Sequence, residues 1–83
     1  MEKTVKVELK DGIDADVVSL LVQKACKYDS RIYLSAGTRR VNMKSIMGMM
    51  NMVVARGGEV VIAAEGSDEE AAVNDIESML KGE

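Results

Sequence analysis

The spacing of the apolar residues switches repeatedly between two and about 3.6 residues, and this alternation limits the possible folds more than any other feature. Val5, Val7 and Leu9 alternate with charged residues, as in a strand with one solvated face. From Ala15 to about Lys27 the spacing becomes helical. The apolar positions of that predicted helix are Val18, Leu21, Val22 and Ala25. The chain is therefore expected to combine a sheet with helices.

The middle of the chain continues this alternation. Residues 31–44 predict a hairpin, because two short alternating runs flank the turn sequence Ala-Gly-Thr-Arg at 36–39. A short helical segment is expected from Ile46 to Val54, with Ser45 as its N-cap. Gly57 and Gly58 end that segment. Residues 59–65 are rich in β-branched residues and predict a strand.

The last segment has the spacing of a capping box. Ser67 is the expected N-cap and Glu70 follows three residues later, so a helix should begin there. Its expected apolar positions are Ala71, Ala72, Ile76, Met79 and Leu80. The predicted order is β-α-β-β-α-β-α, an α+β open-faced sandwich in which three helices cover one face of a four-stranded antiparallel sheet. We expect residues 1–83 to form a single domain.

Composition excludes several classes of function. The chain has 83 residues, no Phe or Trp and only two Tyr, so aliphatic residues and seven Met must fill its core. A net charge of −3 and the scarcity of aromatic residues argue against nucleic-acid binding. The N-terminal stretch has no apolar run that could act as a signal peptide or membrane span, so we expect a cytoplasmic protein with no membrane contact.

Histidine is absent, and Cys26 is the only cysteine. An internal disulfide is therefore impossible, and His-based zinc sites, His general bases and Ser-His or Cys-His nucleophile pairs are excluded. No enzyme activity and no cofactor are expected.

Three carboxylates lie close together in the sequence at Asp11, Asp14 and Asp16. One interpretation is a helix start, in which Asp14 caps the first amides and Asp16 interacts with the positive end of the helix. A metal site is the weaker alternative, because the trio lacks the glycine and distal glutamate of a calcium loop.

The segments at 20–30 (LLVQKACKYDS), 41–50 (VNMKSIMGMM) and 68–80 (DEEAAVNDIESML) resemble HPr, the phosphocarrier family of the bacterial sugar phosphotransferase system. The likeness runs nearly end to end and implies the same fold. The family's active-site pattern is G-I-H-A-R-P-A, which aligns with residues 12–18. Asp14 then stands in place of the phosphate-accepting histidine, Asp16 in place of the supporting arginine, and Val17 in place of the proline.

This substitution pattern is similar to that of the histidine-less HPr-like regulators such as Crh, the catabolite-repression HPr, although those tend to keep the A-R-P segment. The resemblance implies a regulatory protein phosphorylated on Ser45 by a dedicated kinase. It also implies a partner-docking patch formed by Ile46, Met47 and Met50, which Val17 and Leu20 could extend.

The expected partners are proteins: a kinase of the HPr kinase/phosphorylase type, and a LacI-type catabolite regulator or metabolic enzymes. Lys44, Arg39 and Arg40 form a small basic cluster that could meet an acidic partner rim or a phosphate on Ser45. Met43, Met49 and Val53 are expected to pack in the core.

Two alternatives stay open. Asp14 could accept a phosphoryl group as an acyl phosphate, although the second anion at Asp16 disfavours an incoming phosphate. Alternatively, Ser45 is only a helix cap and the chain is an HPr paralogue with another protein partner.

Overall fold

The computed structural model describes residues 1–83, and its four strands form one antiparallel sheet in the order β1-β4-β2-β3. The elements are β1 (Glu2–Lys6), α1 (Ala15–Ala25), β2 (Arg31–Ala36), β3 (Arg39–Asn42), α2 (Ile46–Met50), β4 (Glu59–Glu65) and α3 (Glu69–Leu80). The element order and the sheet confirm the predicted α+β open-faced sandwich.

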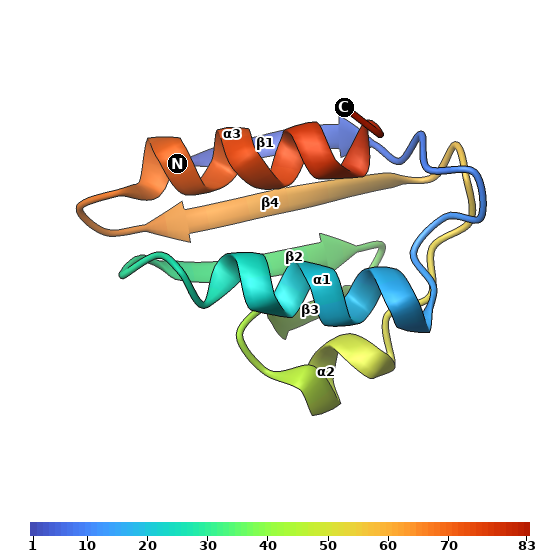
Figure 1. Ribbon diagram of the computed structural model, residues 1–83, viewed down its shortest axis with the longest axis horizontal. Helices are drawn as coiled ribbons and strands as arrows, with labels where there is room; N and C mark the ends of the chain where they lie inside the picture. The colour runs from blue at the N-terminus through green and yellow to red at the C-terminus, as the bar shows by residue number, and fades with distance from the viewer.

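The helices cover one face of the sheet (Figure 1). Helix α3 lies against β1 and β4, while α1 runs alongside it over the other half of the sheet. The short helix α2 contacts both α1 and β3. None of the three helices combines the length and apolar character that crossing a bilayer requires.

The core lies between the sheet and the two long helices. In β4 the buried residues Val60, Ile62 and Ala64 alternate with less buried neighbours, as the period of two predicts. In α1 the buried residues are the four predicted from the helical spacing, Val18, Leu21, Val22 and Ala25. Twenty buried apolar residues form one cluster, so aliphatic side chains and methionines do fill the interior without large rings.

Strand β1 begins and ends earlier than the alternation suggests. It pairs with β4 from Glu2 to Lys6. Val7 lies beyond the strand but is fully buried, and its backbone exchanges hydrogen bonds with Gly57 and Gly58. Leu9 is half-buried against the core. The apolar alternation therefore identified the inward side chains but not the residue where the sheet pairing stops.

Helix α2 is shorter than predicted, and the assignment of Val53 to the core is wrong. The helix ends at Met50 with Asn51 as C-cap, and residues 52–55 are not helical. Met52 and Val54 turn inward, while Val53 between them is 84% exposed. The cause is a change from helical to strand-like spacing after Asn51. Met43 and Met49 are fully buried, as predicted.

Helix α3 begins at Glu69, so the capping box expected at Ser67 and Glu70 is wrong. Asp68 is the N-cap residue, but its carboxylate accepts no capping bond because it binds the loop before β2. Glu69 reaches back to the amide of Gly66. Ala71, expected in the core, is exposed, and the buried stripe is Ala72, Val73, Ile76 and Leu80.

Candidate functional site

Asp14 caps the first helix, as the sequence predicts. Its Oδ1 accepts a hydrogen bond from the Val17 amide at 3.0 Å, and its carbonyl accepts from the Val18 amide at 2.9 Å. Asp16 lies in the first turn and is exposed, where a negative charge interacts favourably with the helix dipole. The start of α1 is therefore occupied by the protein's own carboxylates.

The three carboxylates near this helix start form no metal site. The structure contains no group of three His, Cys, Asp or Glu side chains placed to hold a metal ion. Asp11, Asp14 and Asp16 are all exposed, and none belongs to any of the four ion pairs. The metal alternative gains no support from the geometry.

Ser45 caps the second helix. Its Oγ accepts a hydrogen bond from the Gly48 amide at 3.2 Å, and its carbonyl accepts from the Met49 amide at 3.0 Å. The residue is exposed, so its hydroxyl can be reached from solvent. The predicted capping role is confirmed, and it leaves the serine accessible.

An exposed apolar surface follows Ser45 directly. We call it the helix patch; it consists of Leu20 on α1 and Ile46, Met47 and Met50 on α2. Met47 and Met50 are 78% and 65% exposed, and α1 and α2 pack against each other. Val17 is only half-buried and packs against the core, so it lies at the edge of this surface.

The predicted basic cluster separates in the folded chain. The Lys44 ammonium donates to the Tyr28 carbonyl at 2.6 Å, which leaves two of its N–H donors for other partners. Arg39 donates to the Asn51 carbonyl, and the Arg40 guanidinium stacks over the Tyr33 ring at 4.5 Å. Arg39 and Arg40 are consecutive residues of β3, so their side chains point to opposite faces of the sheet and the three cations do not share one surface.

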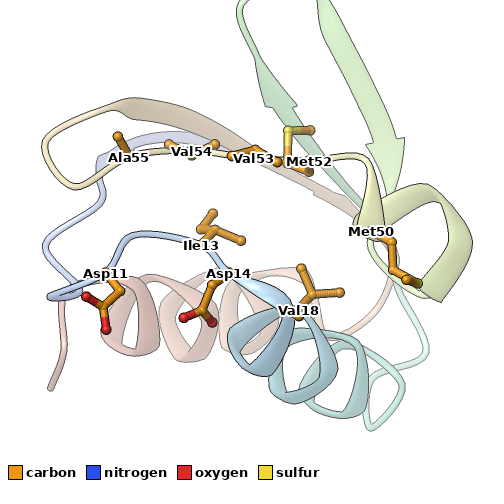
Figure 2. A pocket seen from close by; sticks show the side chains of 10 residues that line it. Asp11, Ile13, Asp14, Val18, Met50, Met52, Val53, Val54 and Ala55 are labelled. Carbon is orange, nitrogen blue, oxygen red and sulfur yellow. The ribbon is translucent and has the colours of Figure 1, made fainter.

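An apolar cleft of about 480 Å³ opens beside the start of α1 (Figure 2). Ile13, Ala15 and Val18 form one wall, and Met50 and residues 52–55 form the other. In Figure 2 the carboxylates of Asp11 and Asp14 lie on the α1 side and point away from the segment that carries Val53 and Val54. The sequence does not predict this cleft, because residues 52–54 are expected to be helical. Their apolar run after Asn51 was the available signal.

The far end of α1 is fixed by a polar network with α3. Asp75 accepts hydrogen bonds from Lys24 at 2.8 Å and from Tyr28 at 2.5 Å. The Lys24 ammonium, with help from the Tyr28 hydroxyl, lowers the pKa of Asp75, and the same Asp75 carboxylate raises the pKa of Tyr28. This network holds α1 in place and so positions the helix start with its carboxylates.

Comparison with protein families gives one match over almost the whole chain. The family model described as "PTS HPr component phosphorylation site" matches residues 1–82. Among curated proteins, the chain is 44% identical over 79 residues to the phosphocarrier protein HPr of Treponema pallidum, covering 95% of this chain and 90% of that protein. It is 36% identical over 83 residues to the HPr-like protein Crh of Bacillus subtilis, covering 100% and 98%.

Solved structures agree with these relatives. The chain matches the crystal structure of a phosphocarrier protein HPr from Bacillus anthracis with a TM-score of 0.92 and 35% identity, covering 96% of this chain and 95% of that one. It matches a crystal structure of Crh from Bacillus subtilis, described as a swapped dimer, with a TM-score of 0.79 and 38% identity, covering 95% and 91%.

Proposed function

This chain belongs to the HPr family, and on that premise we propose that it is a regulatory member without enzyme activity, controlled by phosphorylation of Ser45. In this proposal it acts by docking to other proteins through the helix patch, in carbon catabolite control linked to the phosphotransferase system. The observation that carries the proposal is the placement of an exposed serine directly before the exposed apolar residues of α2.

Phosphoryl transfer through the start of α1 is disfavoured by chemistry. Transfer through phosphohistidine needs an imidazole nitrogen, and the chain has no histidine. The position aligned with that histidine holds Asp14, whose carboxylate already accepts the Val17 amide. Asp16 adds a second anion and no cation pairs with either carboxylate. An arriving phosphate would meet like charges, which raise its free energy of binding.

Phosphorylation of Ser45 is compatible with the fold. The serine is exposed and its hydroxyl makes a single capping bond, so a phosphate can project into solvent while the helix keeps a negative group at its start. The added charge of about −1.5 to −2 would stand next to Ile46 and Met47. Modification would therefore change what the helix patch binds.

The helix patch has the character of a docking surface. Six large apolar residues are exposed in the whole structure, and five of them lie on α1, on α2 or just after α2. Clusters of exposed methionine suit adaptable protein contacts, because the side chain is flexible and polarizable. We propose Ile46, Met47, Met50 and Leu20 as its main contacts, with Val17 and Lys44 at the rim.

The proposed partners follow the family. They are a kinase of the HPr kinase/phosphorylase type, and a LacI-type regulator or metabolic enzymes, all in the cytoplasm. The related Crh proteins are named HPr-like, and one is described as a catabolite repression protein. Regulation through protein contacts is the function that this chain would share with them.

Treatment with an HPr kinase and ATP, followed by mass spectrometry of peptides, tests the proposal. We expect one phosphate on Ser45, absent from Ser45→Ala and retained in the matched control Ser67→Ala, which changes another exposed serine. An unmodified Ser45 would remove the regulatory mechanism and favour an HPr paralogue with a different partner.

A phosphocarrier that uses Asp14 is the second candidate, because the family model is defined by a phosphorylation site. Incubation with the first enzyme of the phosphotransferase system and phosphoenolpyruvate distinguishes it. We expect no transfer. Hydroxylamine-labile phosphate that is lost in Asp14→Asn would establish this second function instead.

A further inference from the structure

We propose that the cleft between α1 and residues 52–55 receives a segment of a partner protein in which an apolar side chain is flanked by Arg or Lys. The apolar side chain would enter between Val18 and Val53. The cations would reach around the α1 side of the cleft to Asp11 and Asp14, whose carboxylates point away from the segment that carries Val53 and Val54 (Figure 2). This inference deepens the proposed docking function and rests on it, since both require a protein partner.

The walls of the cleft are apolar and partly exposed to water. Eight of its ten lining residues are hydrophobic, and its volume of about 480 Å³ is within the usual range for a binding pocket. Val53 is 84% exposed and Met50 is 65% exposed. A ligand that covers these two side chains removes apolar surface from water, which favours binding.

The charge around the cleft is negative and unpaired. Asp11 and Asp14 are its only charged lining residues. Asp14 uses only Oδ1 in its capping bond, so Oδ2 is available to accept a further hydrogen bond, and the Asp11 carboxylate accepts none. Lys10 and Arg56 lie nearby in the sequence but form no ion pair with these carboxylates. The complementary ligand is therefore cationic.

A protein segment fits this combination better than a metal ion or a small anion. No metal-holding group of side chains is present, and an anion would meet unpaired carboxylates. Met50 belongs both to the helix patch and to the cleft wall. A partner seated on α2 can therefore extend a side chain into the cleft without leaving the helix patch.

Synthetic peptides test the proposal with the intact, ¹⁵N-labelled protein. The probe is the blocked peptide Ser-Arg-Leu-Leu-Lys-Ser, with two matched peptides that carry Gln or Glu in place of Arg and Lys. We expect the basic peptide to shift the amide signals of Ile13, Val18 and residues 50–55. The Gln peptide should bind several-fold more weakly, and the Glu peptide more weakly still, with the difference decreasing at high salt.

The variant Asp11→Asn/Asp14→Asn removes both charges and keeps a residue at position 14 that caps helices as well as Asp does. It should lower the affinity for the basic peptide about threefold to tenfold, as expected for the loss of two exposed ion pairs, and leave the affinity for the Gln peptide unchanged. The control Asp29→Asn neutralises an exposed carboxylate that lies outside the cleft and should change nothing.

Three outcomes would each overturn the inference: equal affinity for the basic and acidic peptides, shifts confined to other surfaces, or no shifts at a large excess of the basic peptide. These failures are distinct from failure of the proposed function. If the protein accepts phosphate on Ser45 but shows no peptide shifts, only the proposal about the cleft is wrong. If the protein binds the basic peptide but is not phosphorylated, the proposal about the cleft stands and the regulatory mechanism is wrong.

Discussion

Ile13 and Val54 form an isolated antiparallel bridge, in which the Ile13 amide donates to the Val54 carbonyl at 2.8 Å. The two residues are 41 positions apart (54 − 13) and both are buried. The bridge joins the loop before α1 to the segment after α2. It therefore sets the distance between the two walls of the cleft.

Replacing Gly12 with Ala should disrupt this bridge. Gly12 has a φ of 68°, and an added Cβ would overlap the Val54 carbonyl oxygen, with backbone atoms of Ala55 also in contact. Strain and overlap together should lower the free energy of unfolding by about 2 kcal/mol or more. Urea unfolding followed by circular dichroism measures the loss.

Gly37→Ala is the matched control for this change. Gly37 has a similar φ of 60°, but an added Cβ meets nothing within 4 Å. We expect a smaller loss, about 1 kcal/mol, from the backbone conformation alone. Equal losses at both positions would show that the contact with Val54 does not matter.

Asp14→Ala should destabilise the protein by about 1 kcal/mol, because the Val17 amide loses its capping acceptor. Asp14→Asn keeps an acceptor and should stay within a few tenths of a kcal/mol of the parent protein. Thermal unfolding of the three proteins separates the effects. If the Asn and Ala variants are equally destabilised, the negative charge, rather than the cap, is what stabilises α1.

Truncating two methionines on the same short helix should change the free energy of unfolding by very different amounts. Met49 is fully buried, so Met49→Ala should cost about 2–5 kcal/mol through lost burial and the cavity left behind. Met47 is 78% exposed, so Met47→Ala should stay within about 0.5 kcal/mol. Denaturant titration measures both, and a large loss at Met47 would contradict its placement on the surface.

Acid should destabilise the contact between Asp68 and the loop before β2. Asp68 accepts hydrogen bonds from the Ser30 hydroxyl and from the amides of Asp29 and Ser30, and these bonds lower its pKa. A pKa below its unfolded value of about 3.9 means that the stabilisation is complete above that value and is lost as pH falls through the folded pKa. Urea midpoints between about pH 5 and pH 2 measure this dependence.

The variant Asp68→Asn removes the titrating group and should flatten that acid dependence. Asp29→Asn is the control, because the Asp29 carboxylate accepts no hydrogen bond, and its pH profile should match the parent. An unchanged slope in Asp68→Asn would assign the acid sensitivity to other carboxylates. Asp75, Glu69 and Glu77, whose pKa values are also lowered by their hydrogen-bonding partners, are those candidates.

Local patterns predicted most of the fold because they depend on neighbouring residues only. Three kinds of feature follow from residues close together in the sequence. They are the buried stripe of α1, the inward residues of β4, and the helix caps at Asp14 and Ser45. The exposed position of Leu20 also follows, since it lies off the buried stripe of α1, whereas the exposure of Met47 and Met50 was expected from the family resemblance.

The sequence-based predictions are wrong where a segment distant in the sequence binds a group that was expected to act locally. Asp68 does not cap α3 because Asp29 and Ser30, far away in the sequence, use its carboxylate. Val54 pairs with Ile13 across the structure, so the segment after α2 is not helical, and Val53 beside it is exposed. Lys44 bonds to the carbonyl of Tyr28 and Arg40 stacks over Tyr33, and neither partner is a near neighbour in the sequence.

The sequence by itself therefore determined which elements form, which faces they bury, and that no imidazole can accept a phosphate. Only the tertiary structure decided where helices α2 and α3 begin or end and that a cleft lies between residues 11–18 and 50–55. The physical reason is that periodicity and capping act over a few residues. A hydrogen bond such as that between Ile13 and Val54 depends on where the folded sheet and helices bring distant backbone atoms together.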